Sequence, residues 1–160
     1  MKAILLTLLI AAGAVLADEA AGWGPLTFGM NAAQVRAALP QLQAGKDGAL
    51  RIKGFDYRTS APAPSSPWSL ICLFTAGTLS RVSLTVIPAD SRNRALVRGE
   101  LDDAKARLNG KYGRPVTDET QGSRLKTIWQ TPRAIITLSY LAELNMGTIV
   151  YDPPTGAAGL

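Results

Sequence analysis

The stretch Gly29-Met30-Asn31-Ala32-Ala33-Gln34-Val35 contains several independent signals for one local structure, the start of an α-helix. Asn31 is a favoured N-cap residue, and Gln34, three positions later, suits its reciprocal partner in a capping box. Met30 and Val35 occupy the two positions of a hydrophobic staple. The stretch therefore predicts that a helix begins directly after Asn31.

This helix is expected to run from about residue 32 to residue 39, because Pro40 cannot continue it. So short a helix is unstable in water by itself. It must therefore pack on another element, and the surrounding sequence predicts a β-sheet in that role.

Strand patterns follow the helix. Hydrophobic periodicity predicts strands over residues 50–57, 68–74, 79–87, 123–130, 134–141 and 147–151. A glycine within the first of these, Gly54, predicts a β-bulge. Thr75-Ala76-Gly77-Thr78 is a short glycine-containing connection that predicts a β-hairpin.

The strand over residues 79–87 alternates between polar and apolar side chains from Arg81 to Val86. One set of its side chains is apolar and the other set, Arg81, Ser83 and Thr85, is polar. This alternation predicts one covered and one solvent-exposed sheet face. The segment before the strand over residues 68–74, Ser60–Pro67, has three prolines in eight residues. It is expected to be an extended connector, with a partner-binding loop as the alternative.

A second helix is predicted between the two groups of strands. Its apolar residues recur at spacings of three and four, with Asp90 or Ser91 as the expected cap, Gly113 as the C-terminal residue and Pro115 as the block to continuation. The apolar stripe consists of Val97, Leu101, Ala104, Leu108 and Tyr112. Such a stripe needs a sheet face to cover it.

The order helix, three strands, helix, three strands predicts an α+β fold, with both helices on one face of an antiparallel sheet of about six strands. Arg51-Ile52-Lys53-Gly54-Phe55 and Arg124-Leu125-Lys126-Thr127-Ile128 share a residue pattern, which favours an approximate α-β-β-β tandem repeat. The predicted domain spans residues 18–152, in halves 28–88 and 90–152, with a tail over 153–160. One sheet and two smaller packed sheets both fit this pattern.

Phe28-Gly29-Met30-Asn31-Ala32-Ala33-Gln34-Val35 resembles the helix entry of small exported bacterial modules. These include the BamE-like (SmpA/OmlA) lipoprotein domain and the tandem fold of β-lactamase-inhibitor-like proteins. Lys111-Tyr112-Gly113-Arg114-Pro115, followed by Trp129 and the strand over 135–140, is similar to the helix exit and following strands in the same group. The resemblance implies an exported module with this tandem α+β fold.

The first seventeen residues predict a cleavable secretory signal peptide: Lys2, an apolar run, and Val15-Leu16-Ala17 as the cleavage site. The apolar run stops at Asp18, short of the roughly 20 residues that a spanning helix needs. No cysteine follows it, so we expect no lipid anchor. The predicted location is periplasmic or secreted.

The whole chain carries a formal net charge of +5, which loss of Lys2 would reduce to +4, and its basic residues form no continuous tract. A solvated surface is the expected meaning, and nucleic acid is not an expected partner. Cys72 is the single cysteine and lies in an apolar run, which predicts a buried thiol and no intramolecular disulfide.

The chain contains no histidine, which removes the common Ser-His-Asp and Cys-His schemes and most zinc and copper sites. We therefore expect no enzyme activity, no catalytic residues, no metal and no cofactor. A carboxylate-dependent hydrolase of an envelope polymer is the alternative, with Asp102, Asp103, Asp118 and Glu119 among the candidate carboxylates.

The main functional hypothesis is a non-enzymatic binding module, such as an inhibitor, an immunity-type protein or an envelope-assembly accessory protein. Its partner would be another envelope or secreted protein, bound on the polar sheet face and an adjoining loop. Another alternative is a module that binds anionic lipid or glycan. The candidate binding residues are Trp68, Arg81, Ser83, Thr85, Arg51, Lys53, Arg124 and Lys126.

Overall fold

The computed structural model describes residues 21–88 and 93–154. Its helices are α1 (Ala32–Ala38) and α2 (Arg94–Tyr112). The main sheet contains β3 (Gln43–Ala44), β4 (Leu50–Lys53), β7 (Trp68–Thr75), β8 (Thr78–Val86), β9 (Thr117–Gln121), β10 (Arg124–Gln130), β11 (Ile135–Leu141) and β12 (Met146–Asp152). Two small hairpins pair β1 (Gly22–Trp23) with β2 (Leu26–Thr27), and β5 (Phe55–Asp56) with β6 (Ala61–Pro62).

The predicted signal peptide and residues 155–160 of the predicted tail lie outside the described residues. Neither described helix is long and apolar enough to cross a membrane.

The α+β class is confirmed, but the main sheet has eight strands in one sheet, so the expected number of about six was wrong. The strand order is β3-β4-β7-β8-β12-β11-β10-β9, and every pairing is antiparallel. The two additional strands, β3 and β9, are at the edges. Hydrophobic periodicity missed them because β3 has two residues and β9 reads Thr-Asp-Glu-Thr-Gln, which is tolerated where one side of a strand meets water.

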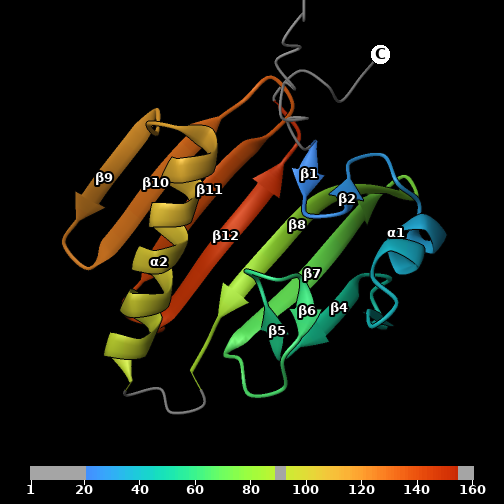
Figure 1. Cartoon of the computed structure of the whole chain (residues 1–160), viewed down its shortest axis with the longest axis horizontal. Helices are drawn as coiled ribbons and strands as arrows, with labels where there is room; N and C mark the ends of the chain where they lie inside the picture. The colour runs from blue at the N-terminus through green and yellow to red at the C-terminus, as the bar shows by residue number, and fades with distance from the viewer. Residues whose placement is uncertain (1–20, 89–92, 155–160) are drawn as a thin grey trace, which may run out of the picture.

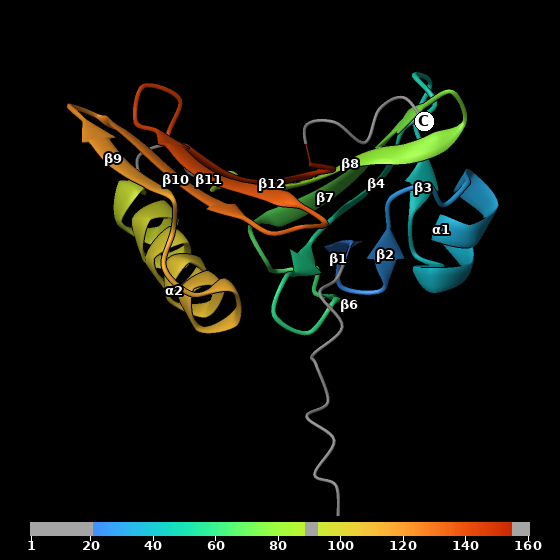
Figure 2. The ribbon, with the colours of Figure 1, turned by 90° about the horizontal axis from the view of Figure 1, so that it is seen from above.

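The sheet is bent across its strands into a trough (Figure 2), with α1, α2, β1, β2 and β6 on its convex side. Figure 1 shows α2 lying across the half that contains β9 to β12, whereas α1 lies beside the other half. Within residues 21–88 and 93–154, no helix or strand covers the concave side.

Both helices form for the local reasons that the sequence indicates. The capping box of α1 is confirmed, since Asn31 and Gln34 exchange hydrogen bonds of 2.9 Å between side chain and backbone. Four residues of the α2 stripe are buried as expected, and the fifth, Tyr112, is half-buried against the same core. Its N-cap, however, is Asn93, whose side chain accepts from the Leu96 amide, so the predicted cap at Asp90 or Ser91 was wrong; these two residues lie outside the described residues.

The predicted strand over residues 50–57 is also corrected. β4 ends at Lys53, and Gly54 adopts φ +67°, which turns the chain out of the sheet. The next residues form the β5–β6 hairpin instead, closed by a 2.7 Å hydrogen bond from the Ala63 amide to the Gly54 carbonyl. A side chain at position 54 would meet the Pro64 backbone at 2.8 Å, so glycine is needed there for space as well as for conformation.

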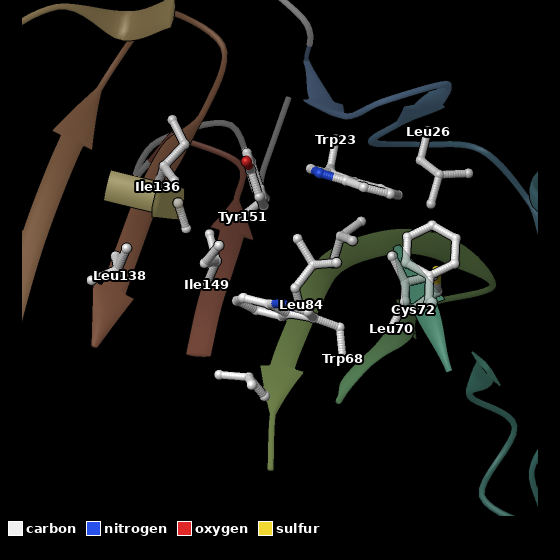
Figure 3. Close-up of a cluster of buried hydrophobic side chains, with 14 of the residues drawn as sticks. Trp23, Leu26, Trp68, Leu70, Cys72, Leu84, Ile136, Leu138, Ile149 and Tyr151 are labelled. Atoms are coloured by element: carbon white, nitrogen blue, oxygen red, sulfur yellow. The ribbon is translucent and has the colours of Figure 1, made fainter. Parts of the chain in front are cut away.

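One apolar layer lies beneath the convex side of the sheet and joins the two halves (Figure 3). Trp68 and Leu84 come from β7 and β8, and Ile149 and Tyr151 come from β12, all essentially buried. Since this face is filled, the exposed side of the sheet is where a partner could bind without unfolding the protein.

Candidate functional site

We define the open face as the concave side of the eight-stranded sheet. Strand alternation places Arg81, Ser83 and Thr85 of β8 there, opposite the buried Val82, Leu84 and Val86. Arg51 and Lys53 of β4, and Arg124 and Lys126 of β10, lie on the same face. Seven of the eight predicted binding residues are therefore on one surface.

The prediction that Trp68, the eighth residue, lies on the binding surface was wrong. Trp68 is 0% exposed, on the convex side, and its Nε1 donates a 2.8 Å hydrogen bond to Glu100 Oε2. Trp129, Tyr140 and Tyr151 also point into the apolar layer on the convex side. The regular alternation of each strand puts its aromatic residues on the covered face.

The register of the strands aligns a single polar row across the open face. Adjacent strands pair Lys53 with Ser69, Ser69 with Thr85, Thr85 with Thr148, Thr148 with Ser139, and Ser139 with Lys126. We call these six residues the hydroxyl row. The four hydroxyl residues are half-buried and the two lysines are exposed. Ser139 Oγ and Thr148 Oγ1 are hydrogen-bonded at 2.7 Å.

Three arginines on the open face already have carboxylate partners. Arg51 binds Asp47 at 2.8 Å, and this hydrogen bond holds the pKa of Asp47 below its usual range. Arg81 makes two contacts with Asp152, at 2.6 and 3.1 Å, and Arg124 lies 3.9 Å from Glu143. By contrast, neither lysine of the hydroxyl row has an ion pair within the described part of the chain.

A cavity of about 820 Å³ opens at one end of the open face. The residues that line it include Leu73, Arg81, Asp152 and Ile135, which are neighbours on adjacent strands, and also Pro153 and Pro154. The Arg81–Asp152 pair therefore stands in the wall of a concave site, where a partner's side chain would contact both charges.

The candidate carboxylates for hydrolysis are not arranged as a facing pair. Asp103 accepts hydrogen bonds from Tyr57 at 2.5 Å and from Arg58 and Arg107 at 3.0 Å, and the bond from Tyr57 is the main reason that the pKa of Asp103 is lowered. These contacts fix the 56–58 segment to α2. They stabilise an ionised carboxylate and disfavour the protonated form that a general acid needs.

The other candidate pair, Asp118 and Glu119, points to opposite faces of β9. On the convex side, Asp118 accepts hydrogen bonds from Lys105 Nζ at 2.7 Å and from Thr127 Oγ1 at 3.0 Å, and these bonds lower the pKa of Asp118. Glu119 pairs in register with Lys126 on the open face. The two carboxylates therefore cannot share one substrate.

Cys72 is buried as predicted, and burial raises the pKa of its thiol to about 12. A thiol so far from ionisation is a poor nucleophile at neutral pH. Within residues 21–88 and 93–154, no group of three acidic or cysteine side chains is close enough to hold a metal ion.

No family model, curated protein or solved structure matches this chain significantly.

The residues that sequence reasoning missed are Ser69, Ser139 and Thr148. Each alternates with buried apolar residues in its own strand, which was the available signal. Their alignment with Lys53 and Lys126 depends on the register between neighbouring strands. The hydrophobic pattern of a single strand shows which face each residue occupies, but not which residue of the next strand lies opposite it.

Proposed function

We propose that this protein is an exported, non-enzymatic binding module that holds a partner protein of the cell envelope or its surroundings on the open face. The observation that carries the proposal is an eight-stranded sheet whose convex side is filled by a core, while its concave side is left uncovered within the described residues. An inhibitor, an immunity-type protein or an assembly accessory protein would use such a surface.

The composition of the open face suits an interface. Hydroxyl residues alternate with half-buried apolar residues such as Ile71, Val150 and Ile128. A surface of this kind offers both apolar contact and hydrogen bonds, as the surfaces of reversible complexes do. In the Pro-rich segment 60–67, β6 lies on the convex side, whereas residues 64–67 line a cavity together with Lys53 and Ser69. This second part of the segment is the adjoining loop in the proposal.

The size of the face also supports binding of a protein. The six strands from β4 to β10 span roughly 24 Å at about 4.8 Å per strand, and seven residues of strand span roughly 23 Å. The projected area is roughly 550 Å² before side-chain relief, which approaches the ~800 Å² that each partner contributes to a standard interface. Counted on both partners, occupation of this face would bury roughly 1,100 Å², which is below the standard size but slightly above the ~1,000 Å² expected of a specific interface.

We also propose that the fold is a tandem repeat, with each unit formed by a helix and the strands that follow it. The strand order supports this, because β3-β4-β7-β8 and β9-β10-β11-β12 each run from an edge to the centre. The similar segments that begin at Arg51 and Arg124 occupy corresponding strands, each second from its edge.

The experiment that tests the proposal is covalent capture of partners from native cell envelope. We expect the Ser83→Tyr, Thr137→Tyr variant to lose the partner, since two bulky, uncharged side chains on the open face would block docking while suiting a strand. The matched control, Ala33→Tyr, Ala37→Tyr, places the same groups on the exposed side of α1. A partner retained by the open-face variant would contradict the proposal.

A further inference from the structure

We propose that the open face receives an acidic α-helix of its partner, which lies along β8 and β12 between Lys53 and Lys126. This inference rests on the proposed function and adds the chemistry and shape of the element that is bound.

The hydroxyl row reads the same from both ends: lysine, serine, threonine, threonine, serine, lysine. Its two threonines, Thr85 and Thr148, stand at the centre of the sheet, where β8 pairs with β12. The lysines lie on β4 and β10, each two strands away from this centre on its own side of the row, and Figure 2 shows the concave side of the sheet that carries the row. The row therefore presents one positive charge on each side of a small, polar centre.

The charge pattern calls for an acidic occupant. The arginines of the open face are matched by Asp47, Asp152 and Glu143, whereas Lys53 and Lys126 have no ion pair within the described residues. Glu119 follows Lys126 in the same row without forming an ion pair, so it weakens the positive potential at that end. Two exposed, unmatched ammonium groups favour carboxylates on both flanks of the bound element.

The spacing fits a helix. The α-carbons of Lys53 and Lys126 are separated by five strand intervals, roughly 24 Å along the sheet. Each lysine stem extends about 6 Å, which leaves about 12 Å between the two ammonium groups if both lean inward. An α-helix with its side chains is about 10–12 Å across. A helix on the centre of the row would therefore bring acidic side chains on both flanks to the two lysines.

Two other occupants fit less well. A second copy of this chain, stacked face to face on the hydroxyl row, would bring lysine against lysine, because the row reads the same in both directions. A glycan would find no ring of Trp68, Trp129, Tyr140 or Tyr151 to stack on, since all four are buried on the convex side.

The test uses two capped 20-residue peptides of alanine with glutamate, or with glutamine, on two opposite helix flanks. Backbone amide NMR shifts of the full chain locate the bound peptide. We expect the glutamate peptide to shift the amides of β8 and β12, and the glutamine peptide to bind at least ten-fold more weakly. Lys53→Glu, Lys126→Glu should weaken binding at least ten-fold. The matched control Arg36→Glu, Arg114→Glu changes the net charge equally at exposed positions off the open face, and should change affinity less than two-fold.

Glu119→Gln should tighten binding, because it removes the negative neighbour of Lys126. The inference is overturned if the glutamate peptide fails to bind, if its shifts map away from β8 and β12, or if the control loses as much affinity as the lysine variant. Binding of phosphatidylglycerol vesicles or polygalacturonate in place of the peptide would also overturn it. A captured partner that is lost with Ser83→Tyr, Thr137→Tyr but kept with Lys53→Glu, Lys126→Glu would overturn this inference and leave the proposed function standing.

Discussion

The indole Nε1 of Trp68 donates a 2.8 Å hydrogen bond to Glu100, which joins β7 of the first half of the chain to α2 of the second. Glu100 Oε2 also accepts from Arg58 at 3.1 Å. Trp129, in the second half, donates to Asn109 of the same helix at 3.2 Å. α2 thus accepts a hydrogen bond from a buried tryptophan of each half of the sheet. The Trp68 contact therefore links the first half of the chain to the second.

Replacing Trp68 with phenylalanine should lower the free energy of unfolding by about 2–4 kcal/mol, because it removes a hydrogen bond to a carboxylate and leaves a gap in the core. Urea denaturation measures the loss. Glu100→Gln should have a smaller effect, since its amide oxygen still accepts from the indole. A Trp68→Phe variant within 0.5 kcal/mol of the wild type would show that the link contributes little.

Gly147→Ala should destabilise the protein by about 1–3 kcal/mol through overpacking. An added Cβ would lie 2.7 Å from Leu101 Cδ1, where α2 presses on β12. Leu101→Val alone should also destabilise, but in the double variant the two losses should not add, because the shorter side chain removes the clash. Thermal unfolding of the four proteins measures this coupling, and strict additivity would refute close contact as the reason for the glycine.

Stability should decrease at alkaline pH through Cys72. Its pKa is raised to about 12 in the folded state from 9.0, so the folded chain retains a proton that the unfolded chain loses. The contribution is intact below about pH 9 and falls by at most about 1.4 kcal/mol per pH unit above it. Urea titrations between pH 8 and pH 10 should therefore show a steeper loss for the wild type than for Cys72→Ala. Parallel curves would rule out this origin.

Tyr57→Phe should reduce stability at neutral pH by about 1–2 kcal/mol, because the hydroxyl donates to the Asp103 carboxylate. The pKa of Asp103 is lowered in the folded state, so its contribution is present above the unfolded pKa near 3.8 and is lost as the pH falls through the folded value. The difference between variant and wild type should thus shrink at pH 2–3. Chemical denaturation at both pH values checks this, and a difference independent of pH would contradict it.

The elements with strong local signals were predictable from sequence. The capping box at Asn31 predicted where α1 begins, and the apolar stripe of α2 predicted which side of that helix packs on the sheet. The edge strands β3 and β9 were missed because strands that are open to water need little hydrophobic alternation. Gly54 was predicted to form a β-bulge, but it forms a turn. A glycine with positive φ suits a bulge and a turn equally, and the turn is set by the close approach of the Pro64 backbone, which lies ten residues further along the chain.

The candidate surface was predicted less completely. Alternation placed Arg81, Ser83 and Thr85 on an exposed face, because that property is contained within one strand. Trp68 was wrongly chosen as a binding residue because it directly follows the Pro-rich segment 60–67, although the first residue of β7 points into the core. The hydroxyl row depends on pairings between residues as far apart as Thr85 and Thr148, which no local pattern encodes.

The position of β12 has a consequence for biosynthesis. β8 ends at Val86 and its central partner β12 begins at Met146, so the ribosome makes all of α2 and β9 to β11 before the sheet can close. Until then β8 is an unpaired edge with apolar residues on one side, which invites association with other chains. A nascent chain of this protein should therefore need protection by a chaperone over that interval, and arrested translation before residue 146 should yield an aggregation-prone intermediate.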